Sequence, residues 1–327
     1  MIEILRLHQR LYNGCLEQRI HAYKDRNISL NYHDQAKELT VLRKEDAQYR
    51  EMNAQSQQVT LKRLELAYKQ FFARVKKGEK AGFPRFKSFD RYKGWGYATH
   101  GDGWRFTPNE SSINGSMRIS GVGILQARGR ARKSDYTACR NPGTAKTMEI
   151  IHKSGKWYAS VTFKRDIPER ASGDSIIGVD WGTMKFLTIV DSFGNVSETK
   201  NPSLMRNTQD KLKKAQRVLS KKKKGSSNRQ KAKNKLIKIH ENLANKREDH
   251  LHKTSSKIIQ TTKHIATEKL NIKGMTASGG SYKKGLNRSI LDTSPGEFFA
   301  KLKYKAEEAG IQYTEIPTKK VKPSQTC

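Results

Sequence analysis

The stretch that decides the fold is Ile176-Ile-Gly-Val-Asp-Trp-Gly-Thr-Met-Lys-Phe-Leu-Thr-Ile-Val-Asp191. It holds two short apolar runs that are rich in β-branched residues, and each run ends in an aspartate. Such runs, separated by a glycine-containing turn, are typical of strands. The segment therefore predicts two consecutive strands that open a new domain, with Asp180 at the end of the first, and residues 192–195 turn the chain toward a third strand.

Downstream, the chain predicts a long basic helical pair over 203–262, because leucines and isoleucines recur there at heptad-like spacing. The run Lys221-Lys-Lys-Lys-Gly-Ser-Ser-Asn-Arg229 separates the two helices. Residues 263–273 then predict a strand that carries one acid, Glu268. A flexible basic loop over 278–285, a helix over about 295–309 and a strand over 311–316 complete the pattern.

Upstream, residues 1–80 predict helices, which include one apolar face from Leu61 to Val75. Residues 78–104 contain seven aromatic residues among lysines and arginines, and their glycines predict a loop. These aromatic rings could stack on nucleic-acid bases, or they could simply pack on a neighbouring domain. Residues 105–165 predict short strands of a small β-barrel, with a hairpin at Lys153-Ser-Gly155, and residues 166–174 predict a linker.

The charge of the chain points to a polyanionic partner. Its 327 residues include 65 Lys and Arg against 31 Asp and Glu, a net charge of +34. Nucleic acid is the expected partner of so basic a surface. No run approaches the roughly 18 apolar residues of a membrane span, and charged residues stand close to Met1. With three distant cysteines, these features predict a cytoplasmic protein that has neither a membrane segment nor a disulfide framework.

Asp180 and Glu268 are the candidate catalytic residues. Metal-dependent phosphodiester hydrolysis needs carboxylates gathered at one point, because hard oxygen ligands bind Mg²⁺. Residue types alone leave other roles open. An aspartate before Gly182 is often a turn residue, and Glu268 could pair with Lys269 or Lys273.

Several motifs, in order along nearly the whole chain, resemble the TnpB (OrfB) family of transposon-associated RNA-guided nucleases, which is similar to type V CRISPR effectors. Gly178-Val-Asp-Trp-Gly182 resembles the first RuvC motif of that family, and Glu268-Lys-Leu-Asn-Ile-Lys-Gly-Met275 resembles the second. The other matching segments are Leu11-Tyr-Asn-Gly-Cys-Leu-Glu-Gln-Arg19, Gly82-Phe-Pro-Arg-Phe-Lys-Ser88, Gly155-Lys-Trp-Tyr-Ala-Ser-Val161 and Lys322-Pro-Ser-Gln-Thr-Cys327.

The resemblance implies an α+β multidomain protein with three parts. These are a helical recognition region with the aromatic-basic loop (1–104), a wedge-type β-barrel (105–170) and an RNase H-like RuvC domain (171–327) with the basic helical insertion 203–262. It also implies that Asp180 and Glu268 bind Mg²⁺ and cleave DNA. The implied partners are target DNA and a guide RNA from the transposon end, with the sequence read by base pairing.

The chain departs from the family pattern at both ends, and we expect it to be truncated there. The family's opening strand is missing, and Cys327 matches only the first ligand of a zinc site that needs four. Zn²⁺ is therefore expected only if the missing C-terminal segment is present. The third RuvC carboxylate is also missing, since Asp292, Glu297 and Glu315 lie in no matching motif.

The sequence therefore predicts an RNA-guided DNA endonuclease, or transposase, of the OrfB type that is incomplete in this chain. The alternative is a non-catalytic remnant of the same family that still binds DNA and RNA. The predicted nucleic-acid contacts are basic side chains of the aromatic loop and the helical pair: Arg85, Lys87, Lys211, Lys213, Lys214, Lys221, Lys222, Lys223, Lys224, Arg229 and Lys231.

Overall fold

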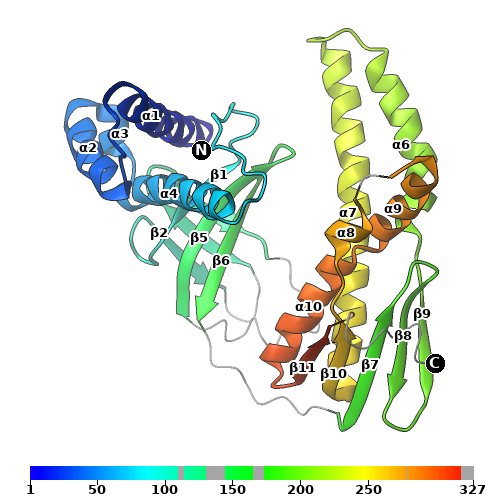
Figure 1. Ribbon diagram of the computed structural model, residues 1–327. Coiled ribbons are helices and arrows are strands. Elements are labelled where there is room, and N and C mark those ends of the chain that lie inside the picture. Colours follow the sequence, from blue (N-terminus) through cyan, green and yellow to red (C-terminus); the bar gives the residue numbers. More distant parts are fainter. Residues whose placement is uncertain (110–113, 130–143, 165–172, 278, 318–327) are drawn as a thin grey trace. The chain divides into compact units, whose positions relative to one another are not determined.

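The computed structural model describes residues 1–109, 114–129, 144–164, 173–277 and 279–317. The chain divides into two compact units, residues 1–166 and 167–327 (Figure 1). The mixed α+β composition expected from the sequence is confirmed. The predicted linker over 166–174 falls largely outside the described residues, as does the family-like segment 322–327.

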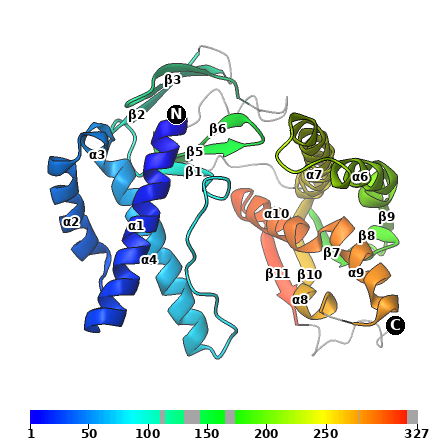
Figure 2. The same cartoon turned by 90° about the horizontal axis from the view of Figure 1, so that it is seen from above.

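The N-terminal unit begins with helices, as predicted: α1 (Ile2–Arg26), α2 (Tyr32–Glu45), α3 (Ala47–Glu51) and α4 (Ala54–Lys76). Asn27 ends α1 with a left-handed backbone (φ 55°), a conformation that asparagine tolerates better than most residues. Asn31 and Asp34 then form a capping box that starts α2. Figure 2 shows α1 and α4 packed side by side, with α2 and α3 next to them.

The strands of this unit form two three-stranded antiparallel sheets. One has the order β1-β5-β6 and the other β2-β3-β4, and both contribute side chains to one core with α1 and α4. The sequence predicts a single small barrel, whereas the described strands pair as two separate sheets. The described strands are β1 (Gly94–Tyr97), β2 (Trp104–Pro108), β3 (Gly115–Ile119), β4 (Gly123–Ala127), β5 (Thr144–Lys153) and β6 (Lys156–Lys164).

Two details of these strands bear on the predictions. The hairpin at Lys153-Ser-Gly155 is confirmed, because Ser154 (φ 53°) and Gly155 (φ 75°) turn β5 into β6. The loop predicted over 78–104 is wrong in part, since β1 lies within it and pairs with β5. The reason is burial: Trp95 and Tyr97 are core residues, which the alternation with glycine did not reveal.

His8 is a fully buried polar residue of this core. Its Nδ1 lies 2.8 Å from Thr60 Oγ1, its Nε2 lies 3.3 Å from Ser56 Oγ, and its ring stacks on Trp95. Burial, helped by the charge of Arg63, lowers the pKa of His8 to about 3. His8 is therefore neutral in the folded unit at physiological pH.

We predict that His8 makes the N-terminal unit sensitive to acid. The folded-state pKa lies below the unfolded value of about 6.5, so the unfolded chain takes up the proton first as the pH falls. The free energy of unfolding should drop by up to about 1.4 kcal/mol per pH unit below 6.5. Urea denaturation at pH 7 and pH 5 measures this drop.

His8→Gln should flatten that pH dependence, whereas the matched change His21→Gln should leave it intact, because the His21 side chain is exposed. An unchanged pH dependence in His8→Gln would show that the buried imidazole is not the cause.

The C-terminal unit is built on a five-stranded sheet with the order β11-β10-β7-β8-β9. The strands are β7 (Ser175–Trp181), β8 (Lys185–Asp191), β9 (Val196–Lys200), β10 (Thr262–Glu268) and β11 (Gln312–Ile316). β10 pairs in parallel with both β7 and β11, whereas β8 and β9 are antiparallel. The strands predicted from residues 176, 186, 263 and 311 are thus confirmed, although the strand predicted over 263–273 ends at Glu268.

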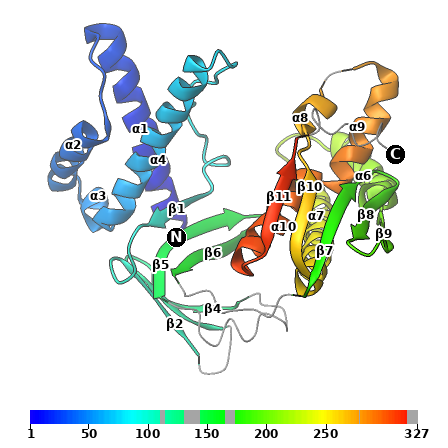
Figure 3. The same cartoon turned by 60° about the horizontal axis from the view of Figure 1, so that its bottom comes forward.

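Helices α7 (Ser227–Thr261) and α10 (Pro295–Glu308) pack on one face of this sheet (Figure 3). The core between them buries Ile177, Val179 and Trp181 of β7 and Ile265 of β10. Leu251 and Ile258 of α7 and Phe298 and Leu302 of α10 complete it from the helix side. Because side chains alternate along a strand, the intervening residues of β7 and β10 lie on the other face of the sheet.

The predicted basic helical pair is also confirmed, as α6 (Leu204–Ser220) and α7. In Figure 1 they run antiparallel, and the turn between them projects away from the strands of this unit. Two further helices are α8 (Ile272–Met275) and α9 (Ser281–Thr293). The flexible loop predicted over 278–285 is wrong from Ser281 onward, because α9 is anchored by the buried Ile290. No helix in the described parts is long and apolar enough to cross a membrane.

Candidate catalytic carboxylates and nucleic-acid surface

Asp180 and Glu268 occupy neighbouring positions on two parallel strands. Thr267 of β10 pairs with Val179 of β7, so the next residue of each strand is one of the two acids. Neighbouring strands lie about 4.8 Å apart, and residues in register point to the same face. Since Val179 and Thr267 are buried, the two acids lie on the opposite face, which α7 and α10 do not cover.

This position is chemically favourable for a ligand. Asp180 and Glu268 lie at the carboxyl ends of β7 and β10, the end where parallel sheets usually bind their ligands. Asp180 is exposed and Glu268 is half-buried. The described residues give neither carboxylate a hydrogen bond or an ion pair, so their oxygens are available to an external cation.

The alternative roles considered for these acids do not appear among the described residues. Asp191 shows what a turn aspartate looks like in this sheet, because its carboxylate accepts from Phe193 N and Asn195 N. The side chain of Asn195 also donates to Asp191, and these hydrogen bonds lower the pKa of Asp191. Asp180 makes no such contacts, and no ion pair joins Glu268 to Lys269 or Lys273 within the described part of the chain.

The described residues do not bring a third acid to the pair. No group of three or more His, Cys, Asp or Glu side chains that could hold a metal ion occurs among them. Glu315 pairs with Lys303 of α10 at 3.9 Å, so it turns toward the helical face of the sheet. Two carboxylates can supply only part of the ligand set of Mg²⁺. The remaining ligands of this ion are normally waters or phosphate oxygens of a substrate.

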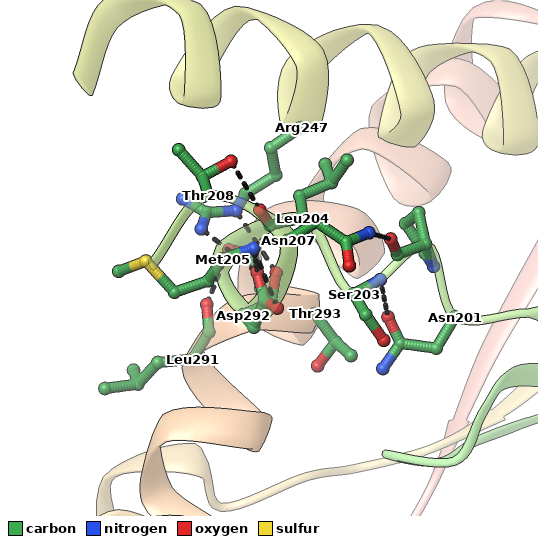
Figure 4. Close-up of polar contacts among 12 residues, drawn as sticks. Asn201, Ser203, Leu204, Met205, Asn207, Thr208, Arg247, Leu291, Asp292 and Thr293 are labelled. Atoms are coloured by element: carbon green, nitrogen blue, oxygen red, sulfur yellow. Dashed lines mark hydrogen bonds and ion pairs between the residues drawn. The ribbon is translucent and has the colours of Figure 1, made fainter. Parts of the chain in front are cut away.

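Asp292, the first of the later acids, has a structural role (Figure 4). Ser203 precedes α6 without providing a side-chain cap, and the Asp292 carboxylate of α9 accepts the Met205 N–H instead, at 2.9 and 3.0 Å. Arg247 of α7 donates from Nε to the Asp292 carbonyl and lies 3.5 Å from its carboxylate. One nearly buried acid therefore joins α6, α7 and α9 at the base of the hairpin.

We predict that Asp292→Ala destabilises the C-terminal unit by about 1–3 kcal/mol, because a helix cap is lost and a half-buried guanidinium loses its partner. The free energy of unfolding in urea measures the effect. Asp210→Ala is the matched control, since Asp210 is an exposed acid on α6, and it should stay within about 0.5 kcal/mol of the parent chain. Equal stability of the two variants would contradict the capping role.

The basic side chains of the hairpin are exposed, as a nucleic-acid surface requires. The α6–α7 segment from Arg206 to Lys257 carries 18 Lys and Arg against four acids. The exposed lysines among the predicted contacts are Lys211, Lys213, Lys214, Lys221, Lys222, Lys223, Lys224 and Lys231. Nothing in the described part of the chain pairs with any of them, so their charges are available to phosphates.

Arg229 differs from these lysines. Its Nη1 donates to the carbonyls of Leu219 and Lys222, at 2.9 Å each, and its side chain is half-buried. These bonds satisfy carbonyls at the C-terminal end of α6 and close the turn of the hairpin. Arg229 therefore stabilises the turn, a role that its position in a basic run did not reveal.

The aromatic residues of 78–104 divide into two sets. Tyr92, Trp95, Tyr97 and Trp104 are buried in the core, whereas Phe83 and Phe86 are exposed. The packing interpretation is therefore confirmed for the four buried residues, whereas base stacking stays a prediction for the exposed Phe83 and Phe86. The predicted contact Arg85 is exposed, and the Lys87 side chain is half-buried.

Asn13 fixes this loop, a role that no sequence pattern indicates. Its amide donates to the Lys87 carbonyl (3.0 Å) and accepts the Lys87 N–H (2.9 Å), while Gln9 also donates to the same carbonyl (2.6 Å). The two partners are 74 residues apart, so no local pattern could indicate them. Cys327, the predicted zinc ligand, lies outside the described residues.

Comparisons with known proteins agree with the motifs. Residues 159–279 match the OrfB_IS605 family, described as a probable transposase. Two curated relatives carry the name "Putative RNA-guided DNA endonuclease". InsQ of Escherichia coli (strain K12) is 33% identical over 277 residues, which are 81% of this chain and 62% of InsQ. A protein of Streptomyces pristinaespiralis is 26% identical over 309 residues, 94% of this chain and 70% of that protein.

The fold is also similar to that of a solved structure. A chain in the cryo-EM structure of the Cas12f1–sgRNA–target DNA complex matches with a TM-score of 0.59 at 13% identity, over 97% of this chain and 72% of that chain. At this identity the likeness concerns the fold. The present chain spans less than two thirds of InsQ. The resemblance drawn from the motifs is nevertheless confirmed, and the chain belongs to the OrfB_IS605 family of probable transposases.

Proposed function

We propose that this chain carries the nuclease centre of an RNA-guided DNA endonuclease of the TnpB (OrfB) type, in an RNase H-like RuvC domain. The observation that carries the proposal is the register of β7 and β10, which makes Asp180 and Glu268 neighbours on the face of the sheet that α7 and α10 do not cover. The names of the two relatives and the family match support the same activity.

In this proposal Asp180 and Glu268 together hold Mg²⁺. When bound, the ion supplies activation of the attacking water and stabilisation of the leaving oxygen in phosphodiester hydrolysis. The carboxylates are suited to this task because they are adjacent, accessible and without partners among the described residues. Their role would be to hold the ion at the carboxyl ends of β7 and β10, where a phosphate of the DNA backbone would supply further oxygen ligands.

The partners in this proposal are a guide RNA from the transposon end and a target DNA. The exposed lysines of the α6–α7 hairpin neutralise phosphates, while base pairing between guide and target reads the sequence. Such contacts depend on backbone charge, so affinity should fall linearly with the logarithm of the salt concentration.

A cleavage assay tests the function. The purified chain is incubated with its transposon-end RNA, a duplex DNA that carries the matching target, and either Mg²⁺ or EDTA. We expect cleavage only when Mg²⁺, the RNA and the matched target are all present. Cleavage in EDTA or without RNA would overturn the proposal.

One observation favours a second candidate, a non-catalytic member of the family that binds RNA and DNA. The described residues assemble two carboxylates rather than three. In the same assay this candidate predicts RNA-dependent binding of the matched DNA without strand cleavage at any Mg²⁺ concentration.

A further inference from the structure

We infer that the end of α4 and the loop after it form a stacking platform for an unpaired DNA strand. The platform consists of Tyr68, Phe71, Phe72, Phe83 and Phe86. Phe72 is 59% exposed and Phe83 is 46% exposed, although large aromatic side chains normally seek burial. Their exposure calls for an explanation that core packing does not supply.

Two of the three exposed rings, Phe72 and Phe83, are held by two half-buried rings. Tyr68 stacks on Phe72 (centroids 6.3 Å apart) and meets Phe83 edge-on at 5.6 Å. Phe71 contacts Phe72 and Phe83 at 5.1 and 5.3 Å. The Arg19 guanidinium in turn lies 5.0 Å from the centroid of the Tyr68 ring and pairs with Glu65 at 2.9 Å. The exposed rings therefore sit on a fixed base instead of moving freely.

The loop that carries Phe83 and Phe86 is fixed as well. Asn13 holds both the N–H and the carbonyl of Lys87, as described above. Further along, Phe89 lies under the Arg6 guanidinium at 5.3 Å. A loop without secondary structure is thus pre-organised by side chains of α1 in the same unit, which lowers the entropic cost of binding.

The charge around the rings selects the ligand. Residues 69–93 contain nine Lys and Arg and two acids. The exposed cations in this segment that make no ion pair within the described residues include Arg74, Lys76, Lys77, Lys80 and Arg85. Aromatic rings among cations are the combination that binds single-stranded nucleic acid, since unpaired bases stack and phosphates are neutralised. A protein partner would not require so many unpaired positive charges.

The inference rests on the proposed function in one respect, the source of the strand. Opening a DNA duplex for pairing with a guide RNA leaves unpaired DNA bases that need a binding surface. Duplex DNA offers no accessible base faces, so the platform should discriminate between single-stranded and duplex DNA.

The test measures DNA affinity by fluorescence anisotropy, with the full chain, at several salt concentrations and without guide RNA or Mg²⁺. The double variant Phe72→Leu/Phe83→Leu keeps apolar bulk but loses the aromatic faces. It should bind a short single-stranded DNA about 5- to 150-fold more weakly, because stacking contributes about 1–3 kcal/mol per base. The salt dependence should stay unchanged, since no charge is removed.

Two comparisons make the result specific. Phe193→Leu alters an even more exposed ring in the other unit and should change affinity by less than about twofold. Lys76→Gln/Lys77→Gln should reduce the salt dependence of single-strand binding, which the aromatic variant leaves intact. A melting temperature equal to that of the parent chain confirms that the aromatic variant is folded.

Three results would overturn the inference. The first is unchanged single-strand affinity in the aromatic variant, and the second is an equal loss for duplex DNA. The third is a loss confined to single-stranded RNA. The binding assay contains neither guide nor metal. Weaker single-strand binding in the aromatic variant, together with no guided cleavage by the parent chain, would therefore reject the proposed function but not the platform. Guided cleavage together with unchanged single-strand affinity would reject the platform alone.

Discussion

Asp180→Asn is expected to reduce the rate of target cleavage by at least about 10³-fold while leaving DNA binding intact. The change keeps the size of the side chain and removes the negative charge that holds Mg²⁺. A catalytic metal contributes several kcal/mol to transition-state stabilisation, which corresponds to a loss of this size. Glu268→Gln should have an effect of the same order, because the two acids lie on paired strands of the same sheet.

The measurement is the single-turnover cleavage rate with guide RNA and saturating Mg²⁺. Glu297→Gln is the matched control, since it removes an exposed acid of α10 in the same unit and should cleave at the parental rate. Guided cleavage that persists at the parental rate in Asp180→Asn would refute the assignment of this carboxylate.

Changing Lys221, Lys222, Lys223 and Lys224 together to glutamine should weaken binding to duplex DNA by up to about 10³-fold near 0.1 M salt. Each phosphate contact that is lost should reduce the slope of log affinity against log salt by about 0.9. The four lysines lie in the exposed turn of the hairpin, where the described residues leave them unpaired.

The control for this variant carries the same loss of net charge. Lys24, Lys37, Lys44 and Lys153 are exposed lysines scattered over the N-terminal unit, and their joint replacement by glutamine also lowers the net charge by four. Anisotropy titrations over a series of salt concentrations compare the two variants. Equal losses would mean that total charge, rather than the hairpin, determines affinity.

Elements with regular apolar spacing could be predicted from the sequence. The face from Leu61 to Val75 identified α4, the leucines of α6 and α7 identified the hairpin, and the runs around Asp180 and Asp191 identified β7 and β8. These patterns succeed because one buried face imposes a period on the chain. The same pattern did not reveal that the last third of the α4 face, including Phe72 and Val75, remains exposed.

The features that escaped prediction all depend on contacts between distant residues. The glycines and lysines of 278–285 suggested a loop, but burial of Ile290 makes most of that segment part of α9. Asp292 lies 87 residues from the N–H group that it caps, and Arg229 is bound to the end of a different helix. Sequence spacing carries no information on such pairs, because they form only when the helices pack.

The candidate site was predicted in part. Residue types and motifs identified Asp180 and Glu268, but their adjacency follows from the parallel pairing of β7 with β10, which spacing alone does not specify. The structure also removes Asp292 and Glu315 as candidates for a third carboxylate, because each makes a helix-side contact of its own.

The central claim is that Asp180 and Glu268 hold one and the same divalent cation. Iron-mediated cleavage of the protein backbone tests it directly, because Fe²⁺ in place of Mg²⁺, with ascorbate, cuts the chain next to the bound ion. We predict cuts near both residue 180 and residue 268, and the loss of both cuts in Asp180→Asn and in Glu268→Gln alike. A cut near residue 268 that survives in Asp180→Asn would contradict the shared site.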